Sequence, residues 1–123
     1  MSGGEQARQL GRWGERLVAE ELHARGWRIA ATNYRCRYGE LDVVAENGRY
    51  IVFVEVKLRK SGRFGLPMEA VTVAKQQKLR AAAQQYLLEY PAELQPRFDV
   101  AQVFAPQGMQ TRHPRIEYVE NAF

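Results

Sequence analysis

The sequence predicts an α/β fold, a mixed central sheet flanked by helices, in one domain that spans residues 1–123. Two segments show the three- and four-residue apolar spacing of amphipathic helices, and five others show the alternation or the apolar runs of strands. The predicted order along the chain is α-β-β-β-α-β-β. With 123 residues, 46% of them hydrophobic, the chain can bury one modest core and leaves little room for a second domain.

The first helix is predicted over residues 5–25 and the second over residues 72–89. Apolar residues and one glycine recur along the first helix at spacings of three and four: Leu10, Gly14, Leu17, Val18 and Leu22. Gly26 ends this helix because a residue without a β-carbon readily takes the left-handed conformation of a helix C-terminus. Thr72 is the predicted N-cap of the second helix, and Pro91 ends it.

Strands are predicted for five segments: residues 27–34 (a strand or an extended lead-in), 41–46, 50–58, 97–105 and 116–119. The second and third of these are joined by Asn47-Gly48, which is typical of a two-residue hairpin turn because both residues tolerate positive φ. Residues 58–68 combine Gly62, Gly65 and Pro67 with basic side chains, so a mobile loop is predicted there.

Composition and charge narrow the class of protein. Cys36 is the only cysteine, which excludes an intramolecular disulfide and a cysteine-only zinc site and fits a reducing compartment. The N-terminal residues lack the pattern of a signal peptide, and no apolar run approaches the roughly 18 residues of a membrane helix. We therefore expect a cytoplasmic protein without membrane association. The formal charge of +4, with arginine supplying 14 of 18 basic residues, permits a nucleic-acid partner without establishing one.

Charged residues gather at the end of the most apolar predicted strand. Glu55 and Lys57 follow Phe53 on one face of that strand, because side chains two apart share a face. A two-residue Asn47-Gly48 turn would set Asp42 opposite Phe53, one diagonal step from Glu55 and about 7–8 Å away between backbones. The pattern therefore predicts two carboxylates close enough to share a cation.

Electrostatic repulsion supports the same prediction. Two carboxylates about 4 Å apart repel by roughly 4 kcal/mol at an effective dielectric constant near 20. Lys57 offsets one negative charge, but Asp42 and Glu55, with Glu40 nearby, leave an excess that Mg²⁺ or Mn²⁺ would remove. The alternative is a charged strand end whose acids form salt bridges with Lys57, Arg35 or Arg59.

Asp42 and the triplet Glu55-Val56-Lys57 resemble the Asp-(x)n-Glu-x-Lys motif of the restriction-endonuclease-like superfamily. A longer set of segments is similar to the bacterial YraN-like family, which is grouped with archaeal Holliday-junction resolvases: Gly14-Glu15, Asn33-Tyr34-Arg35, Gly39-Glu40-Leu41-Asp42 and the strand 53–59. The resemblance extends from the first helix through the second helix. It implies a restriction-endonuclease-like fold.

The resemblance also implies roles by position. Asp42 and Glu55 would ligate Mg²⁺ or Mn²⁺, with the Val56 carbonyl as a further ligand. Lys57 would orient or deprotonate the attacking water or stabilise charge on the phosphate. Glu15 matches the acidic residue that resolvase-like nucleases add, with Glu40 as a rival. The alternative for Glu15 is an exposed helix glutamate that pairs with one of three arginines, Arg8, Arg12 or Arg16.

Basic residues around this motif are candidates for phosphate contacts: Arg35, Arg59, Lys60, Arg63, Lys75 and Lys78. The alternative is a solvated basic loop. We expect a Mg²⁺-dependent nuclease that acts on structured or branched DNA, and a homodimer would suit a junction-cutting role. Two alternatives stay open: a nucleic-acid-binding protein of the same fold with little turnover, and a structural adaptor whose acids form only salt bridges.

Overall fold

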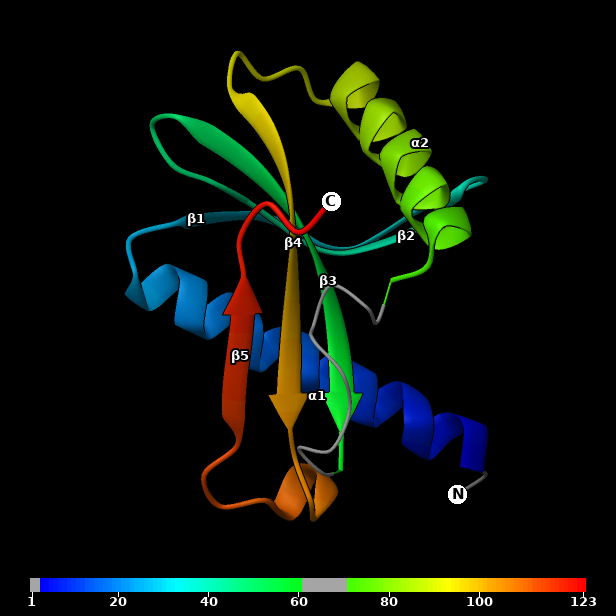
Figure 1. Ribbon diagram of the computed structural model, residues 1–123, viewed down its shortest axis with the longest axis vertical. Helices are drawn as coiled ribbons and strands as arrows, with labels where there is room; N and C mark the ends of the chain where they lie inside the picture. Colours follow the sequence, from blue (N-terminus) through cyan, green and yellow to red (C-terminus); the bar gives the residue numbers. More distant parts are fainter. Residues whose placement is uncertain (1–2, 61–70) are drawn as a thin grey trace.

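A computed structural model describes residues 3–60 and 71–123 and shows two α-helices and a five-stranded mixed sheet (Figure 1). The elements are α1 (Gly3–Ala24), β1 (Arg28–Cys36), β2 (Gly39–Glu46), β3 (Tyr50–Arg59), α2 (Val73–Glu89), β4 (Gln95–Phe104), the 3₁₀ helix η2 (Gly108–Gln110) and β5 (Arg115–Val119). The sheet order is β1-β2-β3-β4-β5. Among the strands of the described residues, only the β3–β4 pair is parallel. The predicted α/β fold is confirmed, and it is consistent with a restriction-endonuclease-like fold.

The two helices cover opposite faces of the sheet. On the α2 face, Ile51 and Phe53 of β3 pack with Tyr86 of α2 in one buried cluster. On the α1 face, Val52 and Val54 pack with Val18 and Leu22 of α1 in a second cluster: both helical residues are nearly fully buried. The strict alternation of β3 between these clusters explains why both of its faces are apolar. Within the described residues, neither helix has the length and apolar character that crossing a membrane requires.

Gly14 allows α1 to approach the sheet closely. A β-carbon at this position would lie 2.8 Å from the Leu58 Cδ2 atom of β3, inside van der Waals contact. Glycine costs a helix interior about 1 kcal/mol relative to alanine, so the close approach accounts for a residue that helix propensity disfavours. The next residue, Glu15, is thereby held against the sheet.

The register of the β2–β3 hairpin differs from the prediction by two residues. Val44 pairs with Phe53 and Glu46 with Ile51, so the sequence-based pairing of Asp42 with Phe53 is wrong. The reason lies in Asn47, whose Oδ1 accepts hydrogen bonds from the backbone amides of Arg49 (2.8 Å) and Tyr50 (2.6 Å). Asn47 therefore opens the turn instead of sitting at its centre. A shift of two residues leaves every side chain on its predicted face.

Buried Asp99 connects β4 to β5 and to the C-terminal residues. Its carboxylate accepts two hydrogen bonds from Arg97 (3.0 and 2.9 Å), one from the Tyr118 hydroxyl and one from the backbone amide of Asn121 (2.9 Å). The Asp99 side chain has no exposed surface. Each oxygen of the Asp99 carboxylate thus accepts two hydrogen bonds, which offsets the cost of burying its charge.

We expect Asp99→Ala to lower the free energy of unfolding by roughly 3–5 kcal/mol, because it leaves the half-buried Arg97 guanidinium without its carboxylate. The measurement is urea unfolding followed by circular dichroism. Glu21→Ala is the control, since its ion pair with Arg25 is exposed on both sides and should contribute about 0–1 kcal/mol. Equal losses in the two variants would contradict the importance of the buried pair.

Candidate functional site

β2 and β3 separate where the candidate residues lie. Their pairing is seen only as far as Val43 with Val54. Beyond this point β2 continues beside β1 and β3 continues beside β4, so the two strands lead away from each other. We call this opening the fork. Continuing the hairpin register by one residue would place Asp42 opposite Glu55, which puts both acids at the narrow end of the fork.

The Asp42 carboxylate spans the fork. Its Oδ2 atom accepts a hydrogen bond of 2.8 Å from the backbone amide of Val56. This contact satisfies an amide at the point where the β2–β3 ladder has ended. The Asp42 carboxyl group is also hydrogen-bonded to that of Glu55. The predicted neighbourhood of Asp42, Glu55 and Val56 is therefore present, although Val56 contacts Asp42 through its amide.

Asn33 changes which face of the sheet β1 and β2 present at the fork. Its backbone has a φ of 55°, in the left-handed region that asparagine tolerates better than most residues. Val43 packs in the α1-side cluster, yet Leu41, two residues earlier, packs in the α2-side cluster. Regular alternation would put both on one face. Asp42 lies at this change of face, which lets its carboxylate meet groups from both sides.

Glu15 reaches the fork from α1. Its side chain is only 9% exposed and is hydrogen-bonded to the side chains of Asn33 and Asp42. The alternative in which Glu15 is an exposed residue paired with nearby arginines is therefore wrong. Glu15 was predicted as a site residue from the sequence. Asn33 was not, although the segment Asn33-Tyr34-Arg35 belongs to the family resemblance and asparagine tolerates a positive φ.

Three acids converge at the fork. Glu15, Glu40 and Asp42 each offer a carboxylate oxygen, and these oxygens lie within 4.8 Å of one another. Glu55 is adjacent through its contact with Asp42. Two buried carboxylate oxygens, Glu15 Oε2 and Glu55 Oε2, have no hydrogen-bond partner among the described residues. We call these four residues the carboxylate cluster.

Two basic residues border the carboxylate cluster. Lys75 Nζ of α2 lies 3.6 Å from Glu55 Oε2, close enough for an ion pair but too long for a hydrogen bond. Arg35 Nε lies 3.4 Å from Glu40 Oε2. Both basic side chains are substantially exposed. The cluster therefore has partial charge compensation, from Arg35 at Glu40 and from Lys75 at the buried Glu55.

The other predicted site residues are more dispersed. Lys57 is half-buried on β3, two residues beyond Glu55 and paired in register with Gln102 of β4. Arg59 Nε donates a hydrogen bond of 3.0 Å to Gln102 Oε1. Lys60 and Lys78 are exposed. Arg63 and most of the predicted loop 58–68 lie outside the described residues, although residues 58 and 59 belong to β3.

Burial and like charges raise the pKa of the Asp42 carboxyl group to about 9. Desolvation is the largest cause, followed by the hydrogen bond and the charge of Glu55, while the Val56 amide opposes the shift. The pKa of Glu15 is also raised, by burial first and by Glu40; Asn33 and Arg12 oppose it. In the absence of a cation, Asp42 thus holds a proton at neutral pH.

The composition of the cluster fits a hard divalent cation. All of its donors are carboxylate oxygens, which Mg²⁺ and Mn²⁺ prefer over nitrogen or sulfur. A cation would supply the partner that the two buried oxygens lack, and it would favour the ionised form of Asp42. The fit rests on Glu15, Glu40 and Asp42, whose oxygens lie within 4.8 Å of one another, and Glu55 adjoins them through Asp42.

The raised pKa of Asp42 predicts how stability depends on pH. The pKa of the Asp42 carboxyl group rises from 3.8 in the unfolded chain to about 9 in the folded protein. Its contribution to stability is complete when the pH is below the unfolded pKa, and it is lost as the pH rises through the folded pKa. Asp42→Asn cannot ionise but keeps an oxygen that accepts from the Val56 amide. In EDTA, the melting temperature of Asp42→Asn relative to wild type should therefore increase from about pH 5 to about pH 9.

Taking the difference between the two proteins removes the contribution of groups that titrate identically in both. The control is Glu21→Gln, an exposed acid on α1 whose substitution should leave the pH profile parallel to wild type. Parallel profiles for wild type and Asp42→Asn would contradict the assignment of a buried proton to this site.

Comparison with known proteins places the chain in a family. The model of the uncharacterised protein family UPF0102 matches residues 14–103, a range that contains the whole carboxylate cluster. A UPF0102 protein of Symbiobacterium thermophilum is 45% identical over 119 residues, covering 95% of this chain and 98% of the relative. One from Alkaliphilus metalliredigens is 40% identical over 122 residues, covering 95% and 99%. In agreement with the YraN-like resemblance, this chain belongs to the uncharacterised protein family UPF0102.

Proposed function

We propose that this protein is a Mg²⁺- or Mn²⁺-dependent nuclease that hydrolyses phosphodiester bonds in structured or branched DNA. The observation that carries the proposal is the carboxylate cluster, in which oxygens from Glu15, Glu40 and Asp42 lie within 4.8 Å of one another and two buried acid oxygens lack a hydrogen-bond partner among the described residues. The fold class and the Asp42…Glu55-Val56-Lys57 pattern support the same chemistry.

Asp42 and Glu55 are the proposed metal ligands, with Glu15 as the third acid from α1. The Val56 carbonyl is a further proposed ligand. When bound, a divalent metal supplies a water of lowered pKa and stabilises negative charge on phosphate oxygens. The raised pKa of Asp42 fits this role, because a ligand that is protonated without metal gives up its proton when metal binds.

The chain's own residues would complete the site. Hydrolysis forms a bond from a water oxygen to phosphorus and breaks one phosphorus–oxygen ester bond, so negative charge builds on the phosphate. Lys57 shares the strand face of Glu55 and can donate a hydrogen bond to a phosphate oxygen. Lys75 is held at the same acid by its ion pair. The two lysines thus give the α2 side of the fork a positive rim for an anionic substrate.

One observation favours a second candidate function. The ion pairs of Lys75 with Glu55 and of Arg35 with Glu40 partly neutralise the cluster without a metal. A nucleic-acid-binding protein without turnover, or a structural adaptor, would use the acids in this way. Neither alternative explains the buried Glu15 Oε2, which has neither a hydrogen-bond partner nor an ion pair among the described residues.

We expect purified wild-type protein to nick a labelled flap or four-way-junction DNA in Mg²⁺ or Mn²⁺ and not in EDTA. Glu55→Gln and Asp42→Asn should each lower the rate at least about 100-fold, since each removes a metal ligand while keeping the size of the side chain. The rates are measured on denaturing gels.

Glu46→Gln is the matched control, because Glu46 lies at the other end of β2 and pairs with exposed Arg28. It should nick like wild type. Nicking that persists in both cluster variants would show that a contaminant is responsible. A wild-type protein that binds Mn²⁺ without any nicking would instead favour the binding-only alternative.

A further inference from the structure

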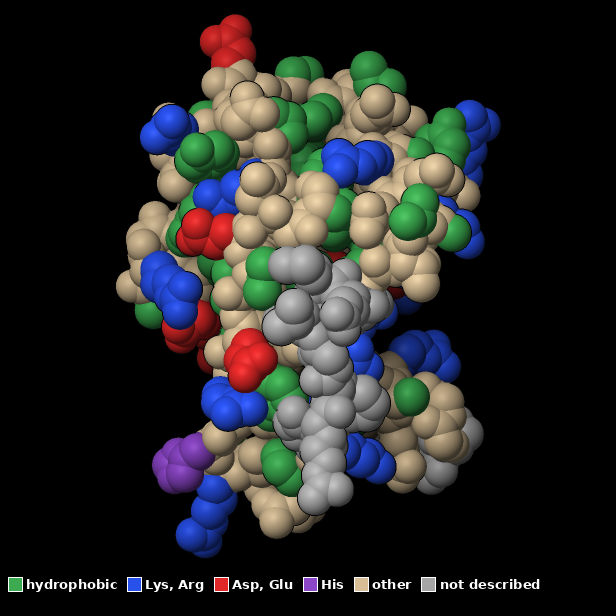
Figure 2. Space-filling view, in the orientation of Figure 1, with side chains coloured by type: hydrophobic (Ala, Val, Ile, Leu, Met, Phe, Trp, Pro, Cys, Tyr) green, Lys and Arg blue, Asp and Glu red, His purple; other side chains and the backbone are tan. Residues whose placement is uncertain are grey.

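The N-terminal half of α1 carries a row of arginines, Arg8, Arg12 and Arg16, each four residues from the next. All three are exposed. Four residues rise about 6 Å along a helix, so the row extends over about 12 Å. In Figure 2, Lys and Arg side chains lie at the lower right, where the N-terminal half of α1 and the end of β3 overlap in this view. In the sequence these three arginines were expected only as partners for Glu15.

The row works against helix stability. Like charges four residues apart on a helix repel, whereas opposite charges at this spacing attract. The C-terminal end of α1 has the favourable arrangement, in the ion pair of Glu21 with Arg25. Within residues 3–60 and 71–123, none of the three arginines of the row forms a salt bridge with an acid. An anionic partner from outside the chain would remove their mutual repulsion.

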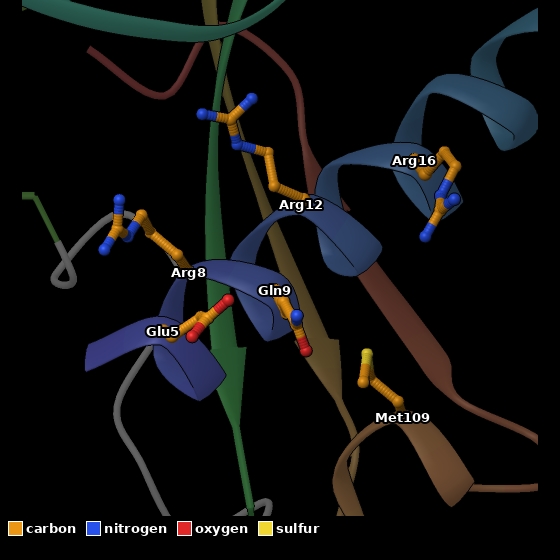
Figure 3. Close-up of a pocket in the computed structure, with 6 residues that line it drawn as sticks. All are labelled: Glu5, Arg8, Gln9, Arg12, Arg16 and Met109. Carbon is orange, nitrogen blue, oxygen red and sulfur yellow. The ribbon is translucent and has the colours of Figure 1, made fainter. Parts of the chain in front are cut away.

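Two adjoining hollows connect the row to the carboxylate cluster. The larger, of ≈ 470 Å³, is lined by all three arginines with Glu5, Gln9 and Met109 of η2 (Figure 3). The smaller, of ≈ 260 Å³, is lined by Arg12 and Arg16 together with Glu15, Ala19, Thr32 and Asn33. The hollows share Arg12 and Arg16, so they adjoin each other. We call the two together the arginine groove.

Positive charge prevails among the side chains that line the larger part of the arginine groove, with three arginines and one acid, Glu5. Apart from Met109, the residues that line its larger part have charged or amide side chains. Figure 3 shows Arg8 and Arg12 extending from α1 in the same direction. Arg12, Glu15 and Asn33 line the same smaller hollow, so the groove adjoins the cluster.

We propose that the arginine groove binds the phosphate backbone of the DNA strand that leads into the carboxylate cluster. This inference rests on the proposed nuclease function and names the surface that positions its substrate. A guanidinium binds phosphate oxygens with two parallel hydrogen bonds. A nucleic-acid strand rises about 3.4 Å per nucleotide, so a row of about 12 Å matches three to four nucleotides. The groove lies on the α1 face, opposite the lysines of the α2 side.

The test is the double variant Arg8→Gln/Arg16→Gln, which leaves Arg12 in place beside Glu15. Affinity for a fluorescein-labelled flap DNA is measured by anisotropy in EDTA at several salt concentrations, so that no cleavage takes place. Each lost phosphate contact should weaken binding about tenfold. The slope of log K against log salt should become shallower by about 1.4–1.8 for two contacts.

Arg25→Gln removes the same charge from the far end of α1 and should bind DNA like wild type. Urea unfolding of the double variant should be unchanged or slightly shifted to higher urea, because repulsion within the row is relieved. Loss of binding with intact stability therefore reports on the surface and not on folding.

The same affinity and salt slope in the double variant and in Arg25→Gln would overturn the proposal. A wild-type protein without salt-dependent affinity for the flap DNA, or with tighter binding to an RNA of the same design, would also overturn it. Failure of the nuclease proposal has a different signature: wild type would bind DNA through the groove and still show no metal-dependent nicking.

Discussion

The separation of β2 from β3 is the constraint on which the rest of the site depends. Each strand keeps its outer neighbour, β1 or β4, and the gap that opens between them is bridged by the Asp42 carboxylate and the Val56 amide. A continuous ladder would have kept the backbone groups at the fork engaged with each other and left less room for side chains. Because the ladder stops, acids from two strands and one helix meet where the backbone itself needs a hydrogen-bond acceptor.

This arrangement costs stability, and the surrounding fold sustains it. Carboxyl groups at the fork are buried close together, so Asp42 keeps a proton that it would lose in water. The sheet around them is apolar on both faces and is anchored at its other edge by the Asp99 network. Local destabilisation of this kind concentrates at functional sites, where the electrostatic conflict disappears when the ligand binds. The sheet therefore holds a cluster of acids in which a cation, as proposed, would relieve the repulsion.

Much of the fold could be predicted because each element has a distinct period or end signal; Thr72, for example, is the observed N-cap of α2. The sequence also predicted Asp42, Glu55 and Glu15 as candidate site residues, the first two from strand alternation and the third from the family resemblance. The predicted hairpin register was wrong because the hydrogen bonds of the Asn47 side chain decide where the turn begins, and the Asn47-Gly48 dipeptide does not form its centre. The change of face at Asn33 and the convergence of Glu40 with Glu15 depend on tertiary packing, which no local pattern encodes. The arginine groove was missed for the same reason, since its lining comes from α1, β1 and η2.

The most direct test of a metal site at the fork is a crystal structure of the protein soaked in Mn²⁺, with anomalous data collected to locate the ion. The account predicts one anomalous peak within about 2.0–2.3 Å of carboxylate oxygens from Asp42 and Glu55, with Glu15 beside it. It also predicts that Lys75 moves away from Glu55. A fork without a peak at saturating Mn²⁺, with the Lys75–Glu55 ion pair and the Asp42–Glu55 hydrogen bond intact, would contradict the central claim.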